Sequence, residues 1–218
     1  SEHLNREYNI PKKNLAIISG PSHAEEVAQE KLTYLTVGTK NSKLGKYISD
    51  LLITKYIIST VSNDMIGIEY SSSLKNIYSI MVGIAHGLGY GDNFVSVLIS
   101  HSSKEMSDFI KAVHKTNRKI NHSAYLGDLL VTTYSSFSRN RTFGNMIGKG
   151  YSINSAKAEM NMIVEGYYAT KNAFMLSKKL STKFLIIDFC YKILFENKSA
   201  KRQMKELSKY LYWGFKLL

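Results

Sequence analysis

A lysine within an apolar helical pattern is the first candidate for chemistry in this sequence. Apolar residues recur at helical spacing between positions 74 and 84, which predicts a helix buried on most sides. Lys75 lies near its start, shortly after three serines and next to Asn76. Because an ammonium is strongly hydrated, burying it is costly and lowers its pKa, which suits a proton donor. The alternative is that Lys75 extends to the surface from the helix end and does no chemistry.

The segment Ser138-Arg139-Asn140 has the composition of an anion-binding site. A planar guanidinium offers a phosphate two parallel charge-assisted hydrogen bonds, and a serine and an asparagine add neutral donors. A helix is predicted to begin here, so the free amides of its first turn would point at the same anion. Arg141 is interpreted as a solvated residue of that helix.

The elements that must position these residues change in kind along the chain. Strands are predicted at 14–19, 32–37 and 56–61, alternating with helices at 22–29 and 42–52. From about residue 63 the periodicity is helical only. The sequence therefore predicts a mainly α fold, with a small α/β piece at 1–62 and an all-helical domain at 63–218. Besides the lysine helix, the helices of that domain are expected at 93–114, 124–134, 139–147, 164–180, 184–196 and 199–212.

Composition excludes several classes of protein. A chain of 218 residues with 44% hydrophobic residues can bury a core. No apolar run is long enough to span a membrane, and the polar N-terminal segment does not resemble a secretory signal. The single cysteine, Cys190, cannot form an intrachain disulfide, which favours a reducing cytoplasm. No histidine pair has metal-ligand spacing, so no metal site is predicted.

The formal net charge of +12 favours anionic partners. A basic C-terminal helix could hold nucleic acid or anionic lipid, which would make the chain a basic binding module instead of an enzyme. However, a nucleic-acid footprint gathers its basic residues on one element, whereas here they are scattered over nearly every predicted helix. A solvated basic surface is therefore the favoured interpretation, without nucleic acid and without membrane insertion.

Two glycine-rich segments superficially match nucleotide-binding motifs. Residues 87–92 follow a helix instead of a strand, and Asp92 stands where the last glycine of a dinucleotide motif belongs. Residues 144–150 have one residue too few between glycines for a P-loop, and Gly150 stands where a Ser or Thr should bind magnesium. We reject both, so the sequence shows no glycine-rich turn that would hold a dinucleotide pyrophosphate.

Five segments form an ordered set of motifs: 19–28 (SGPSHAEEVA), 71–93, 126–129 (LGDL), 138–144 (SRNRTFG) and 164–166 (VEG). Together they closely resemble the motifs of the bacterial-type NAD(P)-dependent glycerol-3-phosphate dehydrogenases, in the family's order and at its approximate spacing. Each motif alone is weak, whereas five in register are specific. The resemblance runs from about residue 15 to about residue 200.

The resemblance implies roles for individual residues. Lys75 matches the family's catalytic lysine, a proton donor in reduction, whose pKa would have to fall from about 10.4 towards neutrality. Asp128 matches an acid that holds the substrate hydroxyls or orients Lys75. The local sequence Gly127-Asp128 is equally consistent with a structural role as a helix N-cap. The implied substrate-binding residues are Gly20, Ser22, Lys75, Asn76, Asp128, Ser138, Arg139 and Asn140. The implied cofactor-contacting residues are Ala24, Arg139, Ile163 and Glu165, with Ile163 in place of a more usual valine.

The resemblance also implies a reaction. The family interconverts dihydroxyacetone phosphate and sn-glycerol 3-phosphate by hydride transfer with NAD(H) or NADP(H), without a metal, and its product supplies phospholipid synthesis. Family members are commonly homodimers. Because the family's chains begin with a full nucleotide-binding domain, residues 1–62 are expected to be the last part of a Rossmann-type domain. The chain alone is therefore expected to be inactive.

Overall fold

The computed structural model of this chain describes residues 2–160 and 162–213. The fold is mainly helical with a small three-stranded mixed sheet near the N-terminus, which confirms the predicted fold class. The chain divides into two compact units, one of residues 1–72 and 121–128 and one of residues 73–120 and 129–218. The sequence prediction placed a boundary at 62/63 from pattern alone, whereas these units follow contacts in space.

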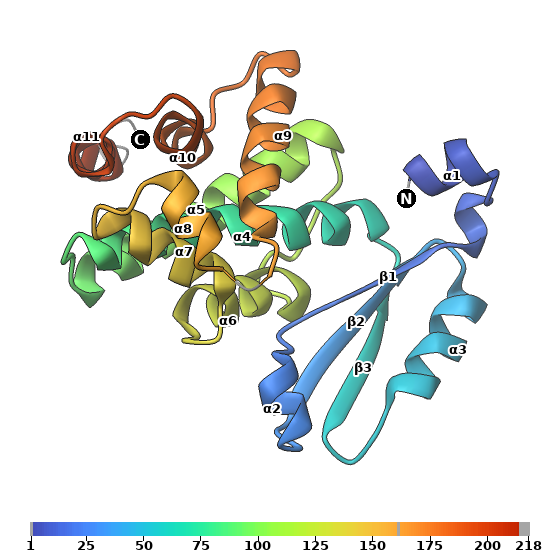
Figure 1. Ribbon diagram of the computed structural model, residues 1–218. Coiled ribbons are helices and arrows are strands. Elements are labelled where there is room, and N and C mark those ends of the chain that lie inside the picture. Colours follow the sequence, from blue (N-terminus) through green and yellow to red (C-terminus); the bar gives the residue numbers. More distant parts are fainter. Residues whose placement is uncertain (1, 161, 214–218) are drawn as a thin grey trace. The chain divides into compact units, whose positions relative to one another are not determined.

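The first unit contains the sheet (Figure 1). Strand β2 lies in the middle, antiparallel to β1 and parallel to β3. Because β2, α3 and β3 follow one another, they form a βαβ unit in which α3 packs against one face of the sheet. The elements of this unit are α1 (Glu2–Tyr8), a 3-10 turn η1 (Lys12–Asn14), β1 (Ala16–Ser19), α2 (Ala24–Ala28), β2 (Thr33–Thr39), α3 (Ser42–Leu52), β3 (Ile57–Ser62) and the π-helical turn η2 (Ser123–Gly127).

Local sequence explains how α3 sits on this sheet. Its N-terminus is capped by Asn41, whose side-chain oxygen accepts the Leu44 amide at 3.2 Å. Gly45 allows close contact, since a Cβ there would lie 2.6 Å from a methyl of Val61 on β3. One turn later, the Ser49 hydroxyl donates to that of Ser59 at 2.9 Å.

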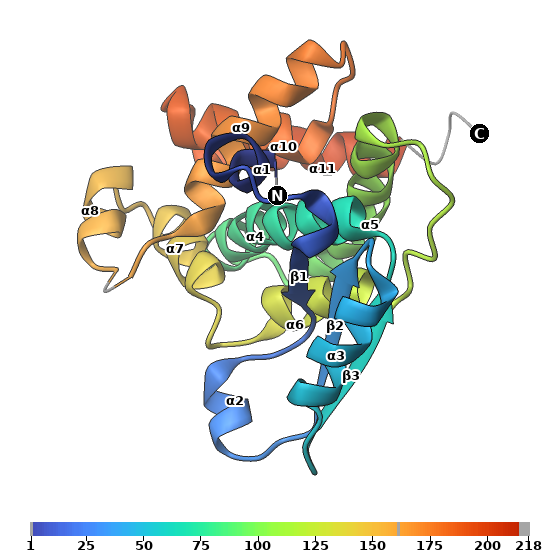
Figure 2. The ribbon, with the colours of Figure 1, turned by 90° about the vertical axis from the view of Figure 1, so that its right-hand side faces the viewer.

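The remaining helices lie mostly in the second unit (Figure 2). Helix α4 (Met65–Gly87) starts within the first unit and runs on as the central helix of the second. Its side chains from Ile77 to Ala85 are buried, as the apolar pattern predicted. The other helices are α5 (Asp92–Val113), α6 (Asp128–Tyr134), α7 (Arg139–Gly148), α8 (Ile153–Ala158), α9 (Glu165–Lys179), α10 (Leu185–Phe195) and α11 (Ala200–Trp213).

Glycines bring α4 and α7 into backbone contact. A Cβ on Gly144 would lie 2.1 Å from the carbonyl oxygen of Ile80, and one on Gly83 would lie 2.1 Å from that of Arg141. Gly87 and Gly148 are comparably tight, with carbonyl oxygens at 2.3 and 2.4 Å. The two helices therefore touch through two glycines spaced four residues apart on each helix. We call Gly83, Gly87, Gly144 and Gly148 the glycine interface.

Three elements differ from the sequence-based expectation. Helices α1 and α8 were not predicted, and residues 124–134 form a π-helical turn followed by α6 instead of one helix. Helix α8 has six residues and buries only Ala156. Its sequence therefore shows no repeat of apolar residues from which a helix could be predicted. Among the residues that the structure describes, no helix combines the length and apolarity needed to cross a membrane.

Candidate functional site

The N-terminus of α7 presents unpaired backbone donors. Ser138 is its N-cap, and its side-chain oxygen accepts the Arg141 amide at 3.3 Å. The amides of Arg139 and Asn140 have no acceptor among residues 2–160 and 162–213. Such amides, together with the helix dipole and the Arg139 guanidinium, can hold an anion. A helix therefore begins at Arg139, as predicted, and anion binding at its N-terminus stays a prediction.

A chain of hydroxyls fixes the cap. Ser79 on α4 donates to the Thr132 carbonyl oxygen at 2.8 Å, and its oxygen lies 2.9 Å from that of Ser138. Because a serine has one hydroxyl proton and Ser79 has given its own to the carbonyl, Ser138 must donate to Ser79. Ser138 is buried and has no proton left for a ligand. It serves the site as the cap of α7.

Asn140 joins three helices through its buried side-chain amide. Its oxygen accepts the Gly166 amide at 2.9 Å, and its nitrogen donates to the side-chain oxygen of Asn76 at 3.0 Å. A Cβ on Gly166 would lie 2.6 Å from the Asn76 carbonyl oxygen, so glycine is required for this contact between α9 and α4. The amide nitrogen of Asn140 carries two protons, and one of them remains available to a ligand.

Arg139 is paired with the start of α9. Its Nη2 lies 3.1 Å from Oε1 of Glu165, and its Nη1 lies 2.9 Å from the sulfur of Met162. The side chains of Arg139 and Glu165 are 38% and 49% exposed. An ion pair this exposed stabilises the fold by only about 0–1 kcal/mol, so an incoming anion can displace it.

Lys75 is half-buried, on α4 between buried Leu74 and half-buried Asn76. Its backbone position is set by the same helix that carries Asn76 and Ser79. The second unit thus brings together, through direct contacts, Asn76 with Asn140 and Arg139 with Glu165.

Asp128 belongs to the first unit and is almost completely buried. Its Oδ2 accepts the Ser19 hydroxyl at 3.0 Å, and the Ser19 oxygen lies 2.7 Å from that of Ser72. Since the proton of Ser19 goes to the carboxylate, Ser72 donates to Ser19. Asp128 is the first residue of α6, but its helical dihedral angles (φ −70°, ψ −34°) and the hydrogen bond from its amide to the Ser123 carbonyl oxygen continue the η2 turn, so it is not the helix N-cap that the local sequence suggested. Sequence reasoning did not identify Ser19, Ser72 or Ser79; Ser19 and Ser79 are polar residues beside apolar ones, and Ser72 lies within a run of three serines.

The loop after β1 carries the remaining predicted residues of the first unit. Gly20 has φ +147°, and a Cβ there would lie 2.3 Å from the Tyr34 carbonyl oxygen, so only glycine fits. Ser22 is exposed and donates to the Gly20 carbonyl oxygen at 3.0 Å. Ala24 is exposed at the start of the five-residue α2.

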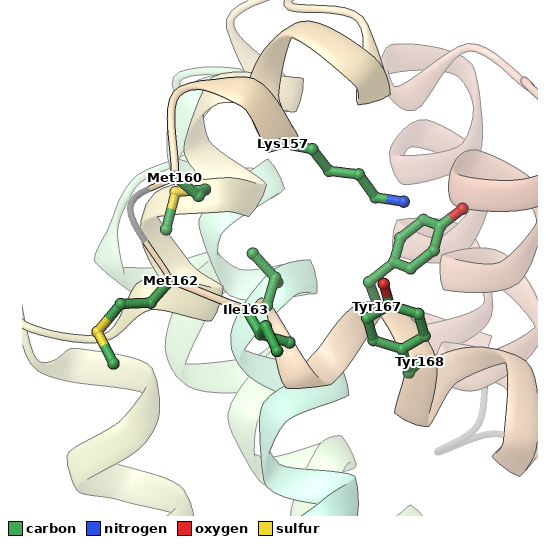
Figure 3. A pocket seen from close by; sticks show the side chains of 7 residues that line it. Lys157, Met160, Met162, Ile163, Tyr167 and Tyr168 are labelled. Atoms are coloured by element: carbon green, nitrogen blue, oxygen red, sulfur yellow. The ribbon is translucent and has the colours of Figure 1, made fainter.

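A pocket of about 360 Å³ lies beside the start of α9 (Figure 3). Figure 3 shows the Lys157 ammonium pointing towards the Tyr167 ring, whose centroid lies 3.2 Å away. Of the predicted site residues, Ile163 lines this pocket and is 71% exposed. The complete lining is Lys157, Met160, Met162, Ile163, Val164, Tyr167 and Tyr168.

A half-buried carboxylate elsewhere in the second unit caps a helix. Glu105 on α5 accepts the amides of Ile186 at 2.8 Å and Ile187 at 3.1 Å, at the N-terminus of α10. Burial raises the pKa of Glu105 from 4.5 to about 7, although these amides act in the opposite direction. Burial likewise raises the pKa of Tyr78, with the charge of Glu105 adding to the effect.

The described residues do not form a complete dinucleotide site. In the βαβ unit, the turn between β2 and α3 is Lys40-Asn41, without glycine, and Asn41 already caps α3. A pyrophosphate cradle needs a glycine-rich turn at this point. Within the same described residues, no group of three His, Cys, Asp or Glu side chains could hold a metal ion.

Comparison with known proteins agrees with these features. A sequence model of the NAD-dependent glycerol-3-phosphate dehydrogenase C-terminus matches residues 64–205, and a model of the N-terminus of that family matches residues 1–45. The glycerol-3-phosphate dehydrogenase [NAD(P)+] of Staphylococcus aureus strain JH9 is 36% identical over 204 residues. That alignment covers 94% of this chain and 60% of the relative, so this chain spans well under the relative's full length.

Solved structures show the same fold. The glycerol-3-phosphate dehydrogenase of Coxiella burnetii aligns with a TM-score of 0.85 at 32% identity, over 88% of this chain and 59% of that protein. The structure of DsGPDH of Dunaliella salina aligns with a TM-score of 0.84 at 20% identity, over 94% of this chain and 36% of that one, which supports the fold alone. The family match covers well over half of the chain and includes every predicted site residue from Lys75 onward. This chain therefore belongs to the NAD-dependent glycerol-3-phosphate dehydrogenase family.

Proposed function

We propose that this chain provides the substrate-binding and proton-transfer part of an enzyme that interconverts dihydroxyacetone phosphate and sn-glycerol 3-phosphate. The observation that carries this proposal is the N-terminus of α7, where the amides of Arg139 and Asn140 have no acceptor among the described residues and Arg139 also carries a half-exposed guanidinium. A phosphate dianion matches that set of donors in charge and geometry. The anion would release Arg139 from Glu165 and take the remaining amide proton of Asn140.

In this proposal Ser138 contributes as the cap that keeps the α7 amides in place, not as a direct hydroxyl donor. Asn76 fixes the orientation of the Asn140 amide through the 3.0 Å bond between their side chains. Gly20 and Ser22 complete the substrate-binding set, as the family resemblance implies.

Lys75 is proposed to move the proton. Reduction of a ketone to an alcohol requires a proton at the carbonyl oxygen, and a lysine ammonium can supply it. Asp128 is proposed to bind the substrate hydroxyls, as the family resemblance implies, with its carboxylate oriented by the bond from Ser19.

The nicotinamide cofactor supplies or accepts the hydride when it is bound. Ala24, Arg139, Ile163 and Glu165 are proposed to contact it, by family resemblance. Because the described residues form no pyrophosphate cradle, these contacts alone would not hold a dinucleotide in place. We propose that the 218-residue chain by itself binds substrate weakly and does not turn it over.

Calorimetric titration of the purified chain tests the proposal. Glycerol 3-phosphate should bind, glycerol at the same concentration should not, and neither NADH nor NADPH should bind detectably. Equal responses to glycerol 3-phosphate and glycerol would contradict phosphate recognition. Oxidation of NADH in the presence of dihydroxyacetone phosphate by this chain alone would contradict its inactivity.

A homodimer, a cytoplasmic location and a supply of glycerol 3-phosphate for phospholipid synthesis are the wider parts of the proposal. Two edge strands, β1 and β3, and the exposed side chains of Tyr34 and Ile58 on the sheet offer surface for self-association. Light scattering measures this directly, and a monomer at all concentrations tested would remove the dimer from the proposal.

A further inference from the structure

Ser79 stands out as a polar residue in the most apolar part of α4. Its side chain is fully buried, between buried Tyr78 and Ile80 in the sequence. Burying a hydroxyl is unfavourable unless it is hydrogen-bonded, and an alanine would satisfy the packing of the helix as well. The hydrogen-bond partners of Ser79 should therefore explain why a serine occupies this position.

Both partners lie outside α4. The Ser79 hydroxyl donates to the Thr132 carbonyl oxygen of α6 at 2.8 Å and accepts from Ser138, the cap of α7, at 2.9 Å. A buried serine in a helix more commonly bonds back to its own helix, as Ser102 does with the Leu98 carbonyl oxygen at 2.8 Å. Ser79 thus ties together two other helices.

The consequence is a one-way chain of donors. The Arg141 amide donates to Ser138, Ser138 donates to Ser79, and Ser79 donates to a backbone carbonyl that can only accept. Every hydroxyl proton has one allowed direction, so the Ser138 side chain has one orientation. In that orientation the Ser138 oxygen accepts the Arg141 amide, the third of α7. The amides of Arg139 and Asn140 are left to bind an anion.

We propose that Ser79 is a positioning residue for the anion-binding N-terminus of α7. It acts through Ser138 and touches no substrate. This inference rests on the proposed function, because the anion is taken to be the substrate phosphate. The glycine interface fixes the distance between α4 and α7, so the hydroxyl chain has only to fix the cap.

Two single variants and a double variant test the inference. Ser79→Ala should raise the dissociation constant for glycerol 3-phosphate roughly three- to tenfold, the value of one hydrogen bond. Ser102→Ala removes an equally buried hydroxyl from the same unit and should leave binding unchanged. In a Ser138→Ala background, adding Ser79→Ala should have no further effect, because Ser79 acts only through Ser138.

The outcomes separate this inference from the proposed function. If the unmodified chain and Ser102→Ala bind glycerol 3-phosphate and Ser79→Ala binds equally well, or if the two effects add in the double variant, the inference is overturned. If the unmodified chain does not bind, the proposed function fails, and hydrogen exchange decides the inference independently. Faster exchange of the Arg141 amide in Ser79→Ala than in Ser102→Ala supports it, whereas equal rates overturn it.

Discussion

The hydroxyl of Ser19 donates to the carboxylate of Asp128 across 3.0 Å, joining the end of β1 to the start of α6. Residues 109 positions apart in the sequence are thus held in one buried contact. Because Ser72 donates to Ser19 in turn, the carboxylate ends a chain of hydroxyls that begins on α4. Residues near the end of β1 and on α4 thus both help to position the Asp128 carboxylate.

Ser19→Ala should lower the free energy of unfolding by about 1.5–3 kcal/mol, the value of a hydrogen bond to a charged group. Thermal and urea denaturation measure the change. Ser42→Ala is the control: this exposed serine at the start of α3 has no side-chain partner within the described part of the chain, and its loss should change stability by no more than about 0.5 kcal/mol. Equal effects of the two substitutions would show that the bond to Asp128 adds nothing to stability.

Lys75→Ala should reduce turnover about a hundredfold or more in a full-length dehydrogenase built on this sequence, because a general acid acts mainly in the transition state. The Michaelis constant for dihydroxyacetone phosphate should change far less. Lys104→Ala, which breaks an exposed pair with Asp108, is the control for loss of a lysine. Near-normal turnover of a folded Lys75→Ala enzyme would mean that Lys75 is not the proton donor.

Arg139→Lys keeps the charge at the start of α7 but loses the planar fork. We expect weaker binding of glycerol 3-phosphate by roughly tenfold, measured by calorimetry. Arg202→Lys, at an exposed position of α11 in the same unit, should bind normally. An affinity unchanged by Arg139→Lys would mean that the phosphate is held by the backbone amides alone.

Gly144→Ala should destabilise the protein by about 3 kcal/mol or more, because the added methyl meets the Ile80 carbonyl oxygen and neither backbone can rotate away. Gly91→Ser is the matched control: no atom lies within 4 Å of its added Cβ, and serine is a good N-cap for α5. Urea denaturation compares the two. A stable Gly144→Ala protein would show that α4 and α7 can separate at little cost.

The pKa of Glu105 predicts a pH dependence of stability. Since this pKa is 4.5 in the reference state and about 7 in the fold, the folded state binds more protons than the unfolded state between these values. The contribution of Glu105 to the free energy of unfolding is therefore full below about pH 4.5 and falls as the pH rises towards 7. Asp108 and Tyr78 lie close enough to influence the carboxyl.

Urea denaturation at several pH values in this window measures the effect, with Glu105→Gln as the variant that cannot titrate. The difference in stability between the unmodified protein and Glu105→Gln should shrink as the pH rises. Exposed Glu25→Gln serves as the control, whose difference from the unmodified protein should not follow this course. A pH-independent difference for Glu105→Gln would mean that the Glu105 carboxyl does not change its protonation in this range.

Much of the fold could be predicted from periodicity. The 42–52 helix matches α3 residue for residue, and the long helices α4 and α5 were found because each repeats its apolar residues over several turns. A short helix such as α8 offers no repeat, and a π-helical turn has no sequence period of its own at this length.

The candidate site was only partly predictable. Arg139 and Lys75 could be proposed because a charge in a helical or apolar context is visible in sequence and because both lie in segments that resemble the family's motifs. The role of Ser79 depends on where one proton goes, which only the positions of Thr132 and Ser138 decide. Likewise, Gly144 appeared in a rejected phosphate-loop pattern, and its use became clear only with the Ile80 carbonyl opposite it.

Substitutions in the glycine interface should affect the stability of the protein and the proposed anion affinity of α7 together. In an ordinary apolar core, a bulkier side chain can be accommodated when a neighbour becomes smaller. Here the neighbours are backbone carbonyls of Ile80 and Arg141, which no substitution can shrink. Any larger residue at Gly83 or Gly144 must push the helices apart, and the donors of α7 would move with their helix. A substitution at any of these four glycines should therefore lower both the anion affinity and the stability of the protein, and no second mutation should restore them.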